Sequence, residues 1–319
     1  MHRPLRLPEI FGLSPFPVRV REALRALRGE PGILPSRFDH TSLGLFLPAL
    51  SVRTWLGQTR PDRRVPIYNL VNRTPTPVSE GWSLRKTQVR DFRGGDLSYD
   101  SHNGTDLILP LGTVVVAPAP ARVLRISREL DRGGLKIFLD HGRGLCTSSN
   151  HLGRALVSVG QVVKRGEPIA LSGYSGLDAI VSFPWSAPHV HFNVWLDGET
   201  ADPFAAPGEI ALWRNGNDPR PAPNEPDEPE EPEEEPFAPT DWDEVGLAAA
   251  IAACTHAPVR DELLAEPALD RRAMNLLFHR NYFPLRFAAR PRVIRDEVKR
   301  EPRLSLPLRP EDFEGVAIE

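Results

Sequence analysis

Short runs of aliphatic and β-branched residues, separated by Gly, Pro and Asp, follow one another between residues 81 and 205. They cover residues 114–116, 121–126, 135–139 and 190–196. Short strands with turn residues at this spacing are typical of an antiparallel sandwich or barrel-like sheet. Because no helix-period segment of useful length interrupts them, the pattern predicts a mainly β fold with one compact antiparallel domain over residues 81–205.

The chain before this domain has a less regular pattern. Val20, Ala23, Leu24 and Leu27 fall on one helical face with arginines between them, and Gly29 is expected to end that helix. A basic amphipathic helix either lies on a membrane surface or packs on its own domain, and packing is the commoner arrangement. We therefore expect residues 1–80 to form an irregular N-terminal extension, in which residues 65–71 form a strand that joins the sheet or covers its edge.

The chain after the β domain falls into two parts. Residues 219–239 are almost wholly proline and acid, a composition that buries no core, so residues 206–240 are expected to form a disordered linker. Residues 241–319 regain helical periodicity, with Thr240 or Asp241 expected to cap a helix that runs to Cys254. Two further short helices are expected within residues 263–278. This C-terminal helical module contains no motif that identifies a protein partner.

Composition narrows the choice of partners and location. A chain of 319 residues with a net charge of −3 gives no electrostatic reason to bind nucleic acid. The first twelve residues lack the apolar run of a signal peptide, and the apolar segment 43–50 is too short to span a bilayer. The sequence therefore predicts no transmembrane segment and a cytoplasmic location. Its two cysteines, Cys146 and Cys254, imply no disulfide framework.

The chemistry begins with two histidines in the strand-like segment 188–192. His189 and His191 are two residues apart, so their side chains point to the same face of a strand. Two imidazoles held this way are a pair of metal ligands, a ligand beside a general base, or a coincidence.

A second cluster lies upstream, where His102 and Asp106 flank Gly104. Histidine and aspartate are residue types that zinc accepts, and three protein ligands with an open position are typical of catalytic zinc. His102, Asp106 and one histidine of the later pair would supply three ligands. The other histidine would then be available for proton transfer.

These two clusters and the motifs between them occur in a recognisable order. They are His-x-Gly-x-Asp at 102–106, Pro-x-Gly-Thr-x-Val at 110–115, His-Gly-x-Gly at 141–144, Thr-x-x-x-His-Leu at 147–152, Val-x-x-Gly at 163–166, Gly-x-Ser-Gly at 173–176 and Pro-His-x-His-Phe at 188–192. In this order the segment 101–204 resembles the LytM/lysostaphin-like zinc metallopeptidases, which cut the peptide part of bacterial peptidoglycan. The resemblance implies their compact β fold, with the metal in a groove on one sheet.

The resemblance also assigns roles to five residues. It implies that His102, Asp106 and His191 bind one Zn²⁺, that His189 is the general base, and that His151 is the second catalytic histidine near the oxyanion. Two positions depart from the family pattern. Ser149 stands where an aromatic residue is frequent, and Asn193 stands where an acid is frequent.

The expected function is therefore hydrolysis of peptide bonds in peptidoglycan stem or cross-bridge peptides by a zinc metalloendopeptidase. This substrate lies in the cell envelope, which conflicts with the cytoplasmic location expected above. Three alternatives stay open. They are a non-catalytic module that binds peptidoglycan or activates another hydrolase, a cytoplasmic metallopeptidase with a protein or peptide substrate, and a structural zinc domain.

Overall fold

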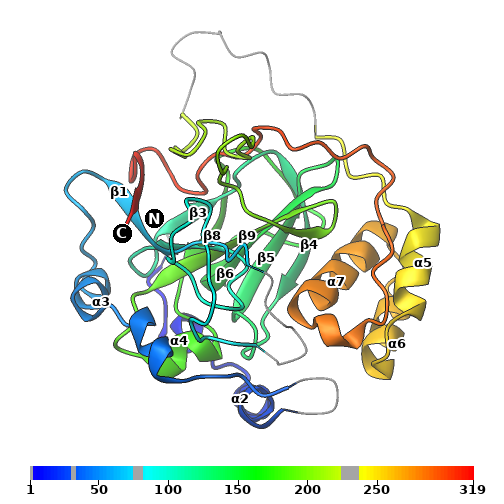
Figure 1. Ribbon diagram of the computed structural model, residues 1–319, viewed down its shortest axis with the longest axis horizontal. Coiled ribbons are helices and arrows are strands. Elements are labelled where there is room, and N and C mark those ends of the chain that lie inside the picture. The colour runs from blue at the N-terminus through cyan, green and yellow to red at the C-terminus, as the bar shows by residue number, and fades with distance from the viewer. Residues whose placement is uncertain (1–2, 30–33, 75–81, 224–236) are drawn as a thin grey trace.

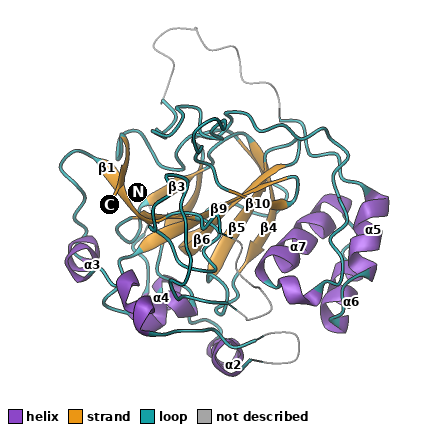
Figure 2. Ribbon diagram, viewed as in Figure 1, coloured by secondary structure: helices purple, strands orange, loops and turns teal. Residues whose placement is uncertain are grey.

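The structure is a computed structural model that describes residues 3–29, 34–74, 82–223 and 237–319. Eleven strands form one mixed sheet in the centre, and helices lie around it, as Figures 1 and 2 show. The predicted mainly β class is confirmed, and the helices α5 to α7 stand together on one side. The centre of the predicted linker, residues 224–236, lies outside the described residues.

The strands include the predicted β segments, to within a few residues, and others that were not predicted. They are β1 (Arg64–Asn69), β2 (Thr105–Ile108), β3 (Val114–Val116), β4 (Ala121–Ser127), β5 (Leu135–Asp140), β6 (Leu145–Ala155), β7 (Val162–Val163), β8 (Pro168–Ser172), β9 (His189–Leu196), β10 (Glu199–Ala201) and β11 (Gly315–Ile318). The sheet has the order β11-β1-β2-β9-β6-β5-β4-β7, with β3 joined through β8 to β6, and β10 joined to β9. Among the described strand pairs, only β1 and β11 run parallel.

The helices are found mainly at the two ends of the chain. They are α1 (Leu7–Ile10), α2 (Phe16–Arg28), α3 (Pro48–Trp55), α4 (Leu177–Ser182), α5 (Glu244–Ala252), α6 (Ala257–Ala265) and α7 (Leu269–Tyr282), with 3₁₀ turns η1 (His40–Leu45) and η3 (Pro284–Arg286). The cap of α5 is Asp243, whose side chain accepts a hydrogen bond from Val245 N. The predicted cap, Thr240, instead donates to Asp140 Oδ1 over 2.6 Å, because it lies against the sheet.

Strand β9 shows how the sheet separates two environments. Val190, Phe192 and Val194 point into the main core, which fills one face of the sheet. Trp195 points to the opposite face, where it packs with helices α5 to α7 in a second core. Because alternate residues of a strand share a face, His189 and His191 lie on the same side of β9 as Trp195. The C-terminal helices and the two histidines therefore share one face of the sheet.

The predicted four-part division stays a prediction, but the structure adds contacts that the composition did not indicate. Leu212 and Trp213, within the segment assigned to the linker, are buried in the main core. The proline-rich tail reaches the same core through Leu304, Leu306 and Leu308. These apolar side chains are few and widely spaced, so the surrounding polar residues and prolines hide them from a composition-based reading.

Helix α2 of the N-terminal extension packs on the domain through polar contacts. Helix α2 donates from Arg25 to both carboxylate oxygens of Asp131 over 2.7 and 2.8 Å, and its Glu22 accepts from Leu130 N over 2.8 Å. Its apolar stripe faces outward, since Leu24 and Leu27 are 41% and 53% exposed. Packing on the domain is thus the observed arrangement, but by the polar face of the helix.

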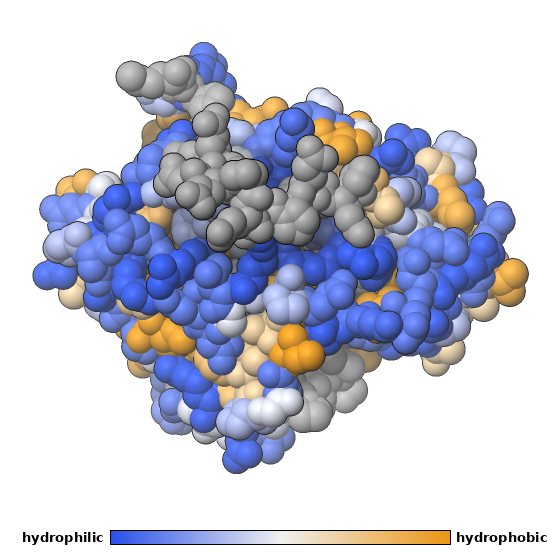
Figure 3. Space-filling view, turned by 90° about the horizontal axis from the view of Figure 1, so that it is seen from above, coloured by the Kyte–Doolittle hydropathy of each residue, from blue (hydrophilic) through white to orange (hydrophobic). Residues whose placement is uncertain are grey.

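The predicted extra strand, β1, joins the sheet beside β2. Within the described ranges, no helix combines the length and apolar character needed to cross a bilayer. Figure 3 shows a largely hydrophilic face on which apolar residues form scattered patches.

We predict that a chain ending after Phe204 is strongly destabilised. The cut removes the helices that cover Phe138 and Trp195, and each side chain of this size contributes roughly 2 kcal/mol when buried. Its melting temperature should fall far below that of the full chain, or cooperative unfolding should disappear in calorimetry. Replacing residues 224–236 by a Gly/Ser segment of equal length is the control and should change the melting temperature little. Equal stability of the truncated and full chains would contradict the shared core.

Candidate metal centre and active site

The register of the sheet brings the two predicted clusters together. Asp106 on β2 lies directly opposite His191 on β9, and His189 lies opposite Ile108. On the other side of β9, His191 lies opposite Asn150 of β6. Asn69 of β1 lies opposite Asp106, so these positions form one polar row across four strands. The row places residues that are 85 positions apart in the chain within contact distance.

His102, Asp106 and His191 converge on one point. His102 Nε2 lies 3.1 Å from His191 Nδ1 and 3.1 Å from Asp106 Oδ2, and His191 Nδ1 lies 2.7 Å from Asp106 Oδ1. All three side chains are buried, and one ligand atom from each lies within 4.8 Å of the others. Two imidazoles and a carboxylate arranged this way can hold a metal ion.

Neighbouring groups orient the ligands. His102 Nδ1 donates to Leu70 O over 2.7 Å, which leaves Nε2 as the acceptor that faces the cluster. Asn69 Nδ2 donates to Asp106 Oδ2 over 2.9 Å. Second hydrogen bonds of this kind fix the tautomer and the orientation of metal ligands. The donor set therefore fits a divalent cation such as zinc.

Electrostatics keeps Asp106 in the form that binds metal. Burial alone raises the pKa of Asp106, but the charges of His102 and His189, with hydrogen bonds from His102 and His191, outweigh it and hold the pKa well below its usual value. Burial lowers the pKa of His191, and Asp106 opposes this only in part. An ionised carboxylate and a neutral imidazole are the protonation states that coordinate metals.

Gly104 makes room for His191. A Cβ atom at this position would lie 2.6 Å from His191 Nε2 and 2.8 Å from Phe192 O, so a larger residue forces the ring to move. The glycine between His102 and Asp106 is thus explained by the close approach of the ring from β9.

His189 and His151 stand beside this cluster. His189 Nδ1 donates to Ala187 O over 2.9 Å, and its Nε2 lies 3.8 Å from Asp106 Oδ1. The ring of His151 has its centroid 4.7 Å from that of His189, and its Nδ1 donates to Ser175 O over 2.7 Å. These positions agree with the roles that the motif resemblance implies, although the roles themselves stay predictions.

A local irregularity of β6 aims His151. The pairing of β5 with β6 slips by one residue between Ser149 and Leu152, which is a β-bulge. Within it His151 has a φ of 59°, a left-handed conformation that is uncommon for a bulky residue. His151 N donates to Gly133 O over 2.9 Å and holds this conformation. The bulge turns the histidine toward the cluster, as residues held in sparsely populated conformations frequently are at functional sites.

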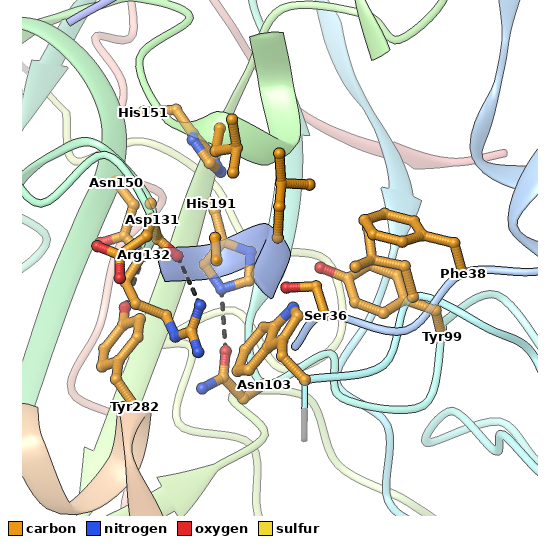
Figure 4. A pocket seen from close by; sticks show the side chains of 16 residues that line it. Ser36, Phe38, Tyr99, Asn103, Asp131, Arg132, Asn150, His151, His191 and Tyr282 are labelled. Carbon is orange, nitrogen blue, oxygen red and sulfur yellow. Dashed lines mark hydrogen bonds between the residues drawn. The ribbon is translucent and has the colours of Figure 1, made fainter. Parts of the chain in front are cut away.

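A cavity of about 320 Å³ opens beside the cluster. The histidines and Asp106 line one side, and apolar residues that include Phe38, Leu45 and Phe46 of the N-terminal extension line the other. Figure 4 shows an adjoining smaller pocket, with His151 and His191 facing Phe38 and Tyr99 across it. The extension therefore supplies part of the wall of the site.

A family model described as peptidase family M23 matches residues 100–203. That segment contains the three clustered ligands together with His151 and His189. The chain carries a peptidase family M23 domain. The resemblance to LytM and lysostaphin that the motifs indicate is thereby confirmed.

Relatives of the M23 domain include metalloproteases and endopeptidases. An uncharacterised metalloprotease of Haemophilus influenzae is 36% identical over 103 residues, which cover 32% of this chain and 20% of the relative. Peptidoglycan DD-endopeptidase ShyB of Vibrio cholerae is 34% identical over 116 residues, covering 36% of this chain and 25% of the relative. The match thus spans about a fifth to a quarter of these relatives.

Two further relatives complete the comparison. The murein hydrolase activator EnvC of Escherichia coli is 35% identical over 92 residues, covering 29% of this chain and 20% of the relative. A solved structure of a zinc-containing peptidase from Vibrio cholerae is 28% identical and covers 43% of this chain and 35% of that chain, with a TM-score of 0.32.

Residues without an assigned role in the motifs also contact the site. Asn69 contacts Asp106, Asn103 and Asn193 contact His191, and Tyr68 packs edge-on against His189 with ring centroids 5.4 Å apart. Asn69 and Tyr68 belong to β1, outside the segment matched by the family. The sequence signal for Asn69 is a polar residue inside the apolar run of the predicted strand 65–71.

His141 of the Gly-rich turn lies apart from this site. Its Nδ1 contacts Pro120 O at 3.1 Å and its Nε2 contacts Thr147 Oγ1 at 2.8 Å. Burial is the main cause that lowers the pKa of His141 to about 3. The residue is therefore neutral and structural at ordinary pH.

We predict that His141 makes the protein less stable in acid. Because its pKa is about 3 when folded and about 6.5 when unfolded, the unfolded chain binds an extra proton between these pH values. The free energy of unfolding should therefore fall as the pH decreases from 6.5 to 3, by at most about 1.4 kcal/mol per pH unit from this group.

Urea denaturation across this pH range measures the effect. The variant His141→Gln keeps a side chain that can donate and accept, and it should show a smaller pH slope than the unsubstituted protein. Identical slopes for the two proteins would show that His141 does not titrate in this window.

Proposed function

We propose that this chain is a zinc metalloendopeptidase that hydrolyses peptide bonds in peptidoglycan stem or cross-bridge peptides. The observation that carries the proposal is the convergence of His102, Asp106 and His191 on one point, with His189 and His151 on the same wall of the cavity. The names of the relatives, among them a peptidoglycan DD-endopeptidase, support the substrate class.

His102, Asp106 and His191 would hold the ion, and a site with three protein ligands keeps a position for water or substrate. Zinc in such a site supplies a Lewis acid for the scissile carbonyl and lowers the pKa of water. The buried, ionised Asp106 contributes negative charge that favours a divalent ion over a monovalent one.

His189 is suited to take the proton of the attacking water. Its Nδ1 proton is committed to Ala187 O, so the acceptor of the neutral ring is Nε2, which faces Asp106. Imidazole changes charge near neutral pH, which makes it an efficient general base there.

His151 is suited to stabilise the oxyanion. Since its Nδ1 already donates to Ser175 O, it donates a hydrogen bond from Nε2 only when both nitrogens carry protons. It then brings a positive charge as well, and preorganised charge near a developing oxyanion is the largest contribution in many hydrolases.

The relationship to the murein hydrolase activator EnvC favours a second candidate, in which the domain binds and activates another hydrolase. The two candidates differ in what the purified chain does alone. New amino termini in a peptidoglycan digest with this chain as the only protein support the peptidase. Release that requires an added hydrolase supports the activator.

We predict about one zinc ion per chain in protein purified without chelator, measured by elemental analysis. Dialysis against a chelator should lower the melting temperature, and added zinc should restore it, because a ligand that binds only the folded state stabilises it. A protein free of metal under these conditions would contradict the proposed peptidase.

We predict that substitutions of His191, His189 and His151 affect zinc content and turnover differently. His191→Ala should lose both zinc and turnover, because two protein ligands remain. His189→Ala should keep zinc and lose turnover by roughly 10²–10⁴, and His151→Ala should keep zinc and lose about 10²–10³.

Zinc content and turnover are measured on the same cross-linked peptide for every variant. His279→Gln, which replaces a buried histidine of α7 outside the cavity, is the control and should keep both. Loss of zinc in His189→Ala with retention in His191→Ala would reverse the assignment.

A further inference from the structure

The ring of His191 is held at both of its nitrogens. Nδ1 faces Asp106 Oδ1 at 2.7 Å, on the side of the metal cluster. Nε2 lies 3.1 Å from Asn103 Oδ1, the contact drawn as a dashed line in Figure 4. A cation on Nδ1 leaves the single proton of the neutral ring on Nε2, so Nε2 donates and Asn103 Oδ1 accepts. Asn103 therefore sets the tautomer and the angle of the ring.

Asn193 holds Asn103 in this orientation. Asn193 Nδ2 donates to Asn103 Oδ1 over 3.0 Å and to Asn103 O over 2.8 Å. Asn193 is completely buried, so reversing its amide would place an acceptor against these oxygens with no water to compensate.

Tyr282 of α7 supports this orientation of the Asn193 amide from the other side, together with Asn150 and Ser148. Its hydroxyl donates to Asn193 Oδ1 over 2.8 Å and accepts from Asn150 Nδ2 over 2.8 Å. Asn150 Nδ2 also donates to Asn193 Oδ1 over 2.8 Å. Because the hydroxyl has one proton and uses it on Asn193, that amide presents oxygen to Tyr282 and nitrogen to Asn103. Figure 4 shows Tyr282 and Asn150 side by side at the edge of the pocket.

The tyrosine is itself firmly placed. It is 4% exposed, and its ring packs against Phe278 with centroids 5.1 Å apart and edge-on to Trp195 at 6.4 Å. These contacts belong to the core that α7 shares with the sheet, so the position of the hydroxyl depends on the C-terminal module.

We infer that Tyr282 is a positioning residue for the metal ligand His191, acting through Asn193 and Asn103. The C-terminal helical module thereby contributes to metal binding, although none of its residues touches the cluster of three ligands. The inference rests on the proposed function only in taking zinc as the ion. Partners of this kind commonly change metal affinity by about 10- to 100-fold when they are removed.

The test is a double-mutant cycle on zinc affinity, measured in the full chain by competition with a chromophoric chelator. Tyr282→Phe removes only the hydroxyl, and Asn103→Ala removes the acceptor at a partly exposed position where folding is not at risk. Each variant should bind zinc about 10-fold more weakly. Because Asn193 Nδ2 also lies 3.1 Å from His191 Nε2, part of the effect bypasses Asn103, and the double variant should lose less than the sum of the two single losses.

Tyr174→Phe is the matched control. Tyr174 is also buried, and its hydroxyl donates to Ser186 O over 3.1 Å, away from the hydrogen bonds that join Asn193 and Asn103. The control should lower the melting temperature as Tyr282→Phe does, yet leave zinc affinity unchanged. The visible spectrum of cobalt-loaded protein gives a second readout, because a displaced ligand alters it, and it should shift in Tyr282→Phe but not in Tyr174→Phe.

Unchanged zinc affinity in Tyr282→Phe, or losses that add in the double variant, would overturn the inference, as would an unsubstituted protein that binds no zinc. A protein that shows the expected coupling but releases no new amino termini from peptidoglycan would retain the inference and refute the proposed peptidase. The two failures are therefore distinguishable.

Discussion

The antiparallel pairing of β2 with β9 sets Asp106 opposite His191, and the rest of the site depends on that register. A slip of one residue would turn every side chain of β9 to the other face and bury both histidines in the main core. The register is secured by Val190, Phe192 and Val194, which are fully buried on that other face. Burial of the apolar residues of β9 therefore determines the face to which its histidines point.

Apolar and polar residues alternate along β9, and the face that carries its histidines has two different surroundings. Near His189 and His191 it faces a cavity, and near Trp195 it is covered by α7. The buried polar groups of Asn150, Asn193 and Tyr282 lie between these regions. A hydrogen-bonded boundary of this kind connects the packing of the helices with the orientation of the metal ligand, as buried polar networks do when every member has a partner.

The motifs predicted the centre of the site because they combine short-range geometry with residue chemistry. His189 and His191 share a face by strand periodicity, so their common direction can be inferred without coordinates. The β class and the limits of β1, β3, β4, β5 and β9 followed from apolar runs in the same way. The contributions of Asn69 and Tyr282 could not be predicted, because each arrives through pairing or packing between segments far apart in the chain.

The buried side chains of the tail and of the linker segment could not be predicted, for a related reason. Leu212 and Trp213 sit among polar residues, and Leu304, Leu306 and Leu308 sit among arginines and prolines. Leu304, Leu306 and Leu308 alternate with Ser305 and Pro307, but so short a run among prolines does not predict a strand, and the structure forms none there. Their burial is decided by the surface they meet, which the local sequence does not describe.

The parallel pairing of β1 with β11 joins Arg64 to Gly315 and Ile67 to Ile318. Contacts between such distant segments carry a large loop-closure cost and slow folding. A nascent chain therefore exposes the outer edge of β1 until residues 315–318 have been synthesised.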